Sequence, residues 1–124
     1  MNNRRPKNLN LLTIRFPIPA IVSILHRISG VILFVLTPIL IAMLGYSLRS
    51  EENFNYLHDM FITPTTKIII LLSLSAFFFH FIAGIRHLLL DLNLGVKLRS
   101  GRRASYLTII LTIIATIIAG YYIW

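Results

Sequence analysis

The 124-residue chain is 56% hydrophobic and 13% charged, and it contains no cysteine. Its apolar residues form long uninterrupted runs that exceed what one small soluble core can bury, which indicates a small integral membrane protein. Without thiols, the chain offers no disulfide, iron–sulfur ligation or thiolate chemistry, so any cofactor must be held through histidine, charged groups or packing.

The first segment, residues 1–20, is a polar and basic lead that we expect to lie against the inner membrane surface. It has no continuous apolar stretch, and Pro17 and Pro19 interrupt it, so we expect no cleavable signal peptide. Pro19 suits the first turn of a helix, where its missing N–H costs nothing.

Three apolar runs qualify as membrane-spanning helices: residues 28–48, 68–85 and 104–124. A hydrocarbon core of about 30 Å needs roughly 20 such residues at about 1.5 Å each. Their many β-branched residues would favour strands in water, but lipid forbids the unpaired edges of an open sheet. A closed barrel is excluded because alternating segments of about ten residues are absent. We predict an all-α membrane protein, with residues 1–124 forming a single anchor domain.

The basic residues predict the orientation of these spans. The chain has twelve basic and four acidic residues and a net charge of +8. Regions that stay in the cytoplasm are enriched in Lys and Arg, so we expect a cytoplasmic N-terminus and a periplasmic C-terminus. Because topology accounts for this charge, nucleic-acid binding is not expected. The cytoplasmic set comprises Arg4, Arg5, Lys7, Arg15 and Arg27 before the first span and Arg86, Lys97, Arg99, Arg102 and Arg103 before the third, against Arg49 and Lys67 between the first two.

The cytoplasmic end of the first helix carries a polar patch. If the helix begins at Pro19, the four- and three-residue spacing places Ser23, Arg27 and Gly30 on one face, with His26 as a close neighbour. The third span differs: threonines repeat every four residues from 108 to 116, which predicts helix packing or bonds to the preceding turn. The aromatic residues of 121–124 predict an anchor at the outer interface.

His80 lies inside the second apolar run, where an ionisable group is costly unless something binds it and therefore marks a functional site. It should lie about 9 Å from Arg86, in the inner half of the bilayer. His80, Gly84 and His87 follow helical spacing and line one stripe. An imidazole in the apolar zone, a position without a side chain and a second imidazole near the surface would suit a flat iron macrocycle.

Simpler interpretations of each residue remain open. His80 can donate a hydrogen bond to a carbonyl of a neighbouring helix. Arg27 and Arg86 can be helix-end residues whose charged groups snorkel to the surface. Gly30 and Gly84 can serve only to let helices approach closely.

Two motifs carry a resemblance to a known family. The segment from Ser23 to Gly30 resembles the S-x-x-H-R-x-[ST]-G signature of the cytochrome b subunit of succinate dehydrogenase. The segment from His80 to Asp91 is similar to the second signature, H-x-x-x-G-x-R-H followed by an Asp. Arg5-Pro6 and the following residues also resemble the family's lead. Leu90 and Asn93 depart from the usual pattern, and neither corresponds to a ligand of the family.

This resemblance implies a membrane anchor of respiratory complex II in the bacterial inner membrane. It implies pairing with a second hydrophobic anchor subunit, as half of a heterodimeric helical anchor that holds the flavoprotein and iron–sulfur subunits on the cytoplasmic face. His80 corresponds to an axial ligand of a b-type haem whose other axial histidine comes from the partner anchor. Ser23 and Arg27 correspond to residues of the ubiquinone site. Arg27 also corresponds to a position near the haem propionates, and His26 and His87 are further candidates for propionate neighbours.

Two other classes of function compete with this interpretation. One is a haem-free structural anchor or assembly subunit in which His80 makes an interhelical hydrogen bond. The other is a small transporter with His80 as a proton relay, which the lack of a second deep acid or base and of an internal repeat disfavours. Succinate oxidation itself is not expected in this chain, because it has no dinucleotide fingerprint, glycine-rich phosphate loop or cysteine ligand set.

Overall fold

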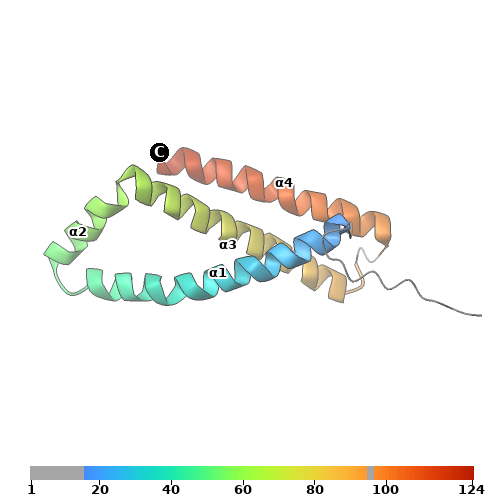
Figure 1. Ribbon diagram of the computed structural model, residues 1–124, viewed down its shortest axis with the longest axis horizontal. Coiled ribbons are helices and arrows are strands. Elements are labelled where there is room, and N and C mark those ends of the chain that lie inside the picture. The colour runs from blue at the N-terminus through green and yellow to red at the C-terminus, as the bar shows by residue number, and fades with distance from the viewer. Residues whose placement is uncertain (1–15, 95–96) are drawn as a thin grey trace, which may run out of the picture.

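The computed structural model describes residues 16–94 and 97–124. The predicted interfacial lead therefore falls largely outside the described residues, since residues 1–15 are not among them. Within the described ranges the chain forms four helices, shown in Figure 1: α1 (Ile18–Ser47), α2 (Glu51–Phe61), α3 (Pro64–Asp91) and α4 (Leu98–Ile123).

In the described part of the chain, three helices are long and apolar enough to cross a membrane: α1, α3 and the Arg99–Ile123 portion of α4. The predicted all-α fold with three spans is confirmed. The helices extend beyond the apolar runs because polar residues at their ends keep helical geometry. In α1, Pro17 is the N-cap in extended conformation and Pro19 lies in the first turn, where proline is well tolerated.

The helix α2 lies between the first two spans and is not among the helices predicted from the sequence. Ser50 caps α2 by accepting a hydrogen bond from the backbone N–H of Asn53 at 3.1 Å, and Glu51 and Glu52 lie in its first turn. Acidic residues there stabilise the positive end of the helix dipole. Leu57 is buried. The capping serine and acidic first turn are local signals for this helix.

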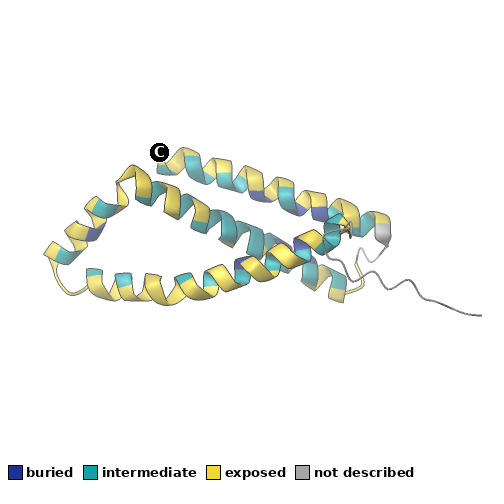
Figure 2. Cartoon of the chain, in the orientation of Figure 1, coloured by how far each residue is buried: buried dark blue, intermediate teal, exposed yellow. Residues whose placement is uncertain are grey.

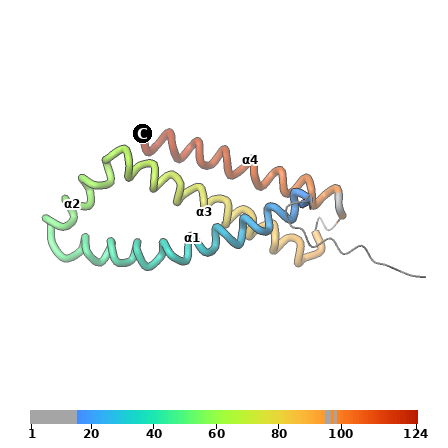
Figure 3. Tube along the Cα trace, in the orientation of Figure 1, coloured from blue at the N-terminus to red at the C-terminus, as the bar shows by residue number. Residues whose placement is uncertain are grey.

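The helix α3 lies between α1 and α4 and contacts both. Figures 1 and 3 show α4 running alongside α3, whereas α1 crosses α3 near one end of the molecule and diverges from it toward α2. The start of α1, the end of α3 and the start of α4 therefore share one end, which we call the histidine end because His26, His80 and His87 lie toward it. The other end carries α2 and the C-terminus. Figure 2 shows exposed outer faces, as expected for helices that face lipid.

Small hydroxyl residues of α4 form much of its contact face. Ser105, Thr108 and Thr112 are buried. Each donates its hydroxyl to the carbonyl four residues earlier, at 2.8 to 2.9 Å, and Thr116 does the same. Their polar atoms are thereby satisfied within the helix while their small size permits close packing. The predicted packing and back-bonding role of these threonines is confirmed.

Candidate functional site

His80 is a half-buried residue of α3 whose imidazole reaches across to α1. Its Nδ1 lies 3.2 Å from the backbone oxygen of His26 and 3.1 Å from the Oγ of Ser29. Ser29 is itself buried, and its hydroxyl donates to the same His26 oxygen at 2.8 Å. One turn of α1 thus holds the edge of the His80 ring that carries Nδ1.

These contacts assign the tautomer of His80. A carbonyl oxygen can only accept, and the Ser29 proton is already used in the bond to the His26 oxygen. An Nδ1 that carries the hydrogen can donate it to the His26 oxygen, and in that tautomer Nε2 has a free lone pair when the imidazole is neutral. Among the described residues Nε2 has no hydrogen-bond partner. A histidine that ligates a metal through Nε2 commonly donates its Nδ1 hydrogen to a carbonyl oxygen in this way.

The three histidines of the two helices form one cluster, which we call the histidine cluster: His26, His80 and His87. The ring of His26 stacks on that of His80 with centroids 4.2 Å apart and an angle of 19°. The rings of His26 and His87 are 5.0 Å apart and tilted by 36°. His26 therefore sits against the stripe of α3 that the sequence analysis singles out.

Two glycines lie where α1 and α3 approach each other at this cluster. A Cβ added at Gly30 would lie only 3.0 Å from Cε1 of His80. One added at Gly84 would lie 3.6 Å from Nε2 of His26, an ordinary contact distance. A side chain at Gly30 would thus crowd the His80 ring, whereas Gly84 leaves room for a methyl group. Close packing is part of the role of Gly30, as one of the simpler interpretations holds.

The residues present fit an axial iron ligand. His80 offers Nε2, and the stacked His26 covers a face of the ring rather than the edge that carries this nitrogen. His26 contributes a second indication: its own Nε2 is buried and has no hydrogen-bond partner in the described part of the chain. A buried polar atom without a partner marks a place where a further group belongs. No group of three or more His, Cys, Asp or Glu side chains within residues 16–94 and 97–124 is arranged to hold a bare metal ion.

Ser23 and Arg27 lie on the same two turns of α1 as His26. Ser23 is half-buried and Arg27 is exposed. Residues four apart on a helix are neighbours, with Cβ atoms about 5–6 Å apart, so the hydroxyl and the guanidinium flank one surface beside the histidine cluster. Among described residues no hydrogen bond or ion pair engages either side chain.

Arg86 behaves differently from the helix-end interpretation given above. Only 7% of it is exposed, and its Nε is buried without a partner among the described residues. The snorkelling interpretation is therefore wrong for Arg86. Sequence spacing did not reveal this, because its burial is produced by the packing of α4 on α3.

No separate role is predicted for Ser29 from the sequence, where it is one position of the first motif. Its hydroxyl nevertheless contacts both His80 and the His26 backbone oxygen, which His80 also contacts. Its position three residues after His26, on the face of α1 that carries buried Val22, is the available signal. The arrangement defines the class of this molecule: a multi-pass helical membrane protein that gathers imidazoles between two of its spans.

Comparison with known proteins gives the family. The profile of the succinate dehydrogenase/fumarate reductase transmembrane subunit family matches residues 1–119. The chain is similar to the succinate dehydrogenase cytochrome b556 subunit of Coxiella burnetii, with 40% identity over 125 residues that cover all of both chains. It is also similar to the subunits of the same description in Rickettsia bellii, at 31% identity over 116 residues, and Rickettsia felis, at 32% over 117, each covering 94% of this chain and 90% of the relative.

The chain belongs to the family of succinate dehydrogenase/fumarate reductase transmembrane subunits. The predicted family resemblance is confirmed over essentially the whole chain. The protein is a multi-pass component of the bacterial inner membrane and functions as a cytochrome b membrane subunit of succinate dehydrogenase.

Proposed function

We propose that His80 is an axial ligand of a b-type haem and that a histidine of a second hydrophobic anchor subunit supplies the opposite ligand. The observation that supports this role is the Nδ1 contact to the His26 oxygen at 3.2 Å, which leaves Nε2 free to bind iron. When bound, such a haem supplies one-electron transfer, since ligation by two imidazoles fills both axial positions. One ligating histidine per chain also means that the isolated subunit should bind haem poorly.

Within this proposal the residues around His80 orient its ring and neutralise the haem propionates. The backbone oxygen of His26 and the Oγ of Ser29 hold the His80 proton at Nδ1. His26 stacks on His80 and lies 5.0 Å from His87. His26, His87 and Arg27 are the proposed neighbours of the haem propionates. The unpartnered Nε2 of His26 suits such a role, because a carboxylate would satisfy it.

We also propose that Ser23 and Arg27 bind ubiquinone. The Ser23 hydroxyl can donate to a quinone carbonyl oxygen, and the Arg27 guanidinium can both donate and stabilise negative charge that develops as the ring is reduced. Each side chain lies toward the histidine end of α1, one half-buried and the other exposed. A quinone head held there would have its tail in lipid.

Partners and orientation follow from the same proposal. The chain would pair with the second anchor to complete the haem site and would dock the iron–sulfur and flavoprotein subunits at the histidine end. That end would face the cytoplasm, since it carries Arg99, Arg102 and Arg103, whereas α2 carries three of the four acidic residues. Because the chain has no cysteine, labelling of an Asn55→Cys variant in intact spheroplasts by an impermeant maleimide tests this. Failure to label Asn55→Cys, with labelling of Gly101→Cys instead, would reverse the orientation.

The haem proposal is tested by the absorbance of the purified complex after reduction. We expect the His80→Ala variant to lose the b-type signal, because the chain's iron ligand is gone. His58→Ala is the matched control, since His58 is an exposed histidine of α2 at the opposite end. An unchanged spectrum in His80→Ala would refute ligation by this residue.

The quinone proposal is tested by two activities of the same preparation. Arg27→Ala should lower quinone reduction by about tenfold or more, since a hydrogen bond to a charged group contributes about 1.5–3 kcal/mol. Succinate oxidation with an artificial acceptor should stay nearly intact. Arg49→Ala removes an exposed arginine near the other end and should affect neither activity. Equal loss of both activities in Arg27→Ala would indicate failed assembly instead of a quinone-site defect.

A second candidate function has an observation in its favour. The bond between His80 and the His26 oxygen joins two helices, as a haem-free structural anchor would require. The same His80→Ala spectrum separates the two functions. A haem-free anchor predicts no b-type signal in the parent complex and a loss of thermal stability in the variant.

A further inference from the structure

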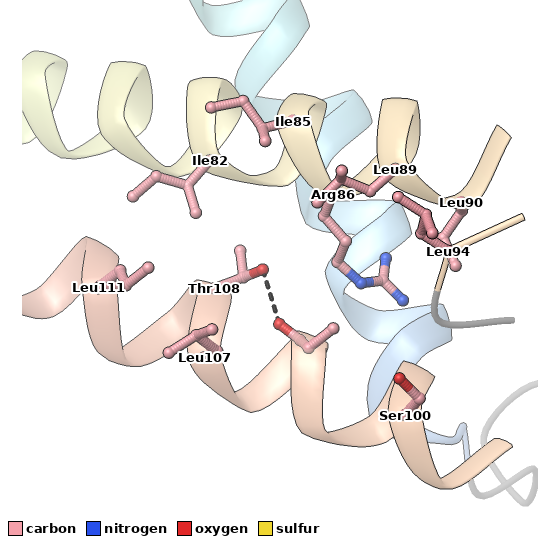
Figure 4. Close-up of a pocket in the computed structure, with 11 residues that line it drawn as sticks. Ile82, Ile85, Arg86, Leu89, Leu90, Leu94, Ser100, Leu107, Thr108 and Leu111 are labelled. Carbon is pink, nitrogen blue, oxygen red and sulfur yellow. Dashed lines mark hydrogen bonds between the residues drawn. The ribbon is translucent and has the colours of Figure 1, made fainter. Parts of the chain in front are cut away.

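The side of the molecule where α3 meets α4 contains a groove unrelated to the histidine cluster. Its volume is about 360 Å³. Figure 4 shows the Arg86 side chain extending from α3 into the space between α3 and α4, toward the level of Ser100. Arg86 is more than nine-tenths buried, and its Nε lacks a hydrogen-bond partner among the described residues.

No carboxylate side chain of the chain neutralises this guanidinium. The sequence holds four acidic residues, Glu51, Glu52, Asp59 and Asp91. The first three belong to α2 at the opposite end, and Asp91 is exposed and makes no ion pair in the described structure. An unpaired cation in a spanning helix is costly. Among the described side chains, Arg86 therefore has no carboxylate counter-ion, which suits an anion supplied by another molecule.

The walls of the groove identify the kind of molecule. They are aliphatic, formed by Ile82, Ile85 and Leu89 of α3 and by Leu107 and Leu111 of α4. Four of these five residues, all except Ile82, are exposed, so the groove opens on the outer surface of the spans. Where no partner subunit covers it, such a surface of a membrane span meets acyl chains. Apolar walls with a buried cation at one end match a lipid tail with an anionic headgroup.

We propose that the α3–α4 groove binds an anionic phospholipid, with its phosphate on the Arg86 guanidinium and an acyl chain along the aliphatic walls. Guanidinium and phosphate form strong, often bidentate, hydrogen bonds. Exposed Arg99, Arg102 and Arg103 on the first turns of α4 add positive charge at the same end. Each such charge near a membrane surface contributes about 1 kcal/mol of attraction for anionic lipid. The proposal does not depend on haem or quinone.

Native mass spectrometry of the purified complex tests this site. The complex is stripped of lipid and then titrated with phosphatidylglycerol, phosphatidylcholine or inorganic phosphate. We expect selective binding of phosphatidylglycerol and an accompanying rise in thermal stability. Arg86→Gln should weaken that binding about fivefold or more, whereas Arg86→Lys should retain part of it.

Two further variants distinguish a groove from a charge effect or a folding defect. Ala104→Leu keeps Arg86 but places a larger side chain in the groove, since Ala104 lines it, and should reduce phosphatidylglycerol binding. Arg102→Gln removes an exposed charge from the same end and should leave most of the phosphatidylglycerol binding intact. The phospholipid bound by each assembled complex is compared directly, so variants that fail to assemble do not contribute.

Several results would overturn the proposal. Phosphatidylglycerol binding that is the same in Arg86→Gln, Ala104→Leu and the parent complex would place the lipid elsewhere. Equal stabilisation by inorganic phosphate would indicate a free-anion site, and equal binding of phosphatidylcholine would remove the need for an anionic lipid. Loss of the second anchor subunit from Arg86→Gln, with lipid binding unchanged, would assign the guanidinium to a protein carboxylate.

Discussion

Replacing Gly30 by alanine should displace the His80 imidazole. The added Cβ would lie 3.0 Å from Cε1 and 3.5 Å from Nδ1 of that ring. Carbon atoms prefer separations of about 3.5–4.0 Å, so the ring or the helices must move by roughly 0.5 Å. The ring has little freedom to move, because Nδ1 is held by the His26 oxygen and Ser29.

The size of the effect follows from two opposing contributions. Overpacking of this kind costs about 1–3 kcal/mol, and the better helix propensity of alanine returns at most about 1 kcal/mol. We therefore expect a net destabilisation of roughly 1 kcal/mol, concentrated at His80. Under the proposed ligation by His80, a displaced imidazole would bind iron less well, so haem content per purified complex should fall and the reduction potential should shift.

Two alanine variants of other glycines serve as controls. Gly45 lies in the same helix with no neighbouring atom within 4 Å of an added Cβ, and Gly84 would meet Nε2 of His26 at 3.6 Å. Both Gly45→Ala and Gly84→Ala should keep haem content and thermal stability close to those of the parent. Gly30→Ala with parental haem content, potential and stability would show that the glycine is not required for the site.

Two other substitutions test separate parts of the structure. Ser29→Ala should keep haem but raise its reduction potential by up to about 40 mV in a redox titration. The variant loses a hydrogen bond of about 1 kcal/mol at Nδ1, which makes His80 a weaker donor to ferric iron. An unchanged or lower potential would contradict this assignment. Ser50→Ala removes the cap of α2 and should cost about 1 kcal/mol, seen as faster amide hydrogen exchange over 51–61 with the haem spectrum unaltered. Unchanged exchange there would show that the Ser50 cap contributes little.

The membrane architecture was predictable because it depends on one-dimensional properties of the chain. Apolar runs long enough to cross a bilayer must become helices in lipid, whatever their β propensity, since only internal hydrogen bonds satisfy the backbone there. The spacing of His80, Gly84 and His87 likewise follows from helix periodicity. The family motifs were visible for the same reason, as each lies within a single helix.

Other features depended on how the helices pack against each other. Ser29 gains its role only when α1 brings its hydroxyl within 3.1 Å of a ring 51 residues later in the chain. Arg86 is buried by α4, although its sequence position beside a helix end suggested exposure. Contacts between distant segments depend on the rotation and crossing of helices, which hydrophobic periodicity within one helix does not fix. The sequence by itself therefore determined the spans and the residues available at the histidine end. Only the tertiary structure decided which nitrogen of His80 contacts α1 and that Arg86 is buried without a carboxylate partner among the described residues.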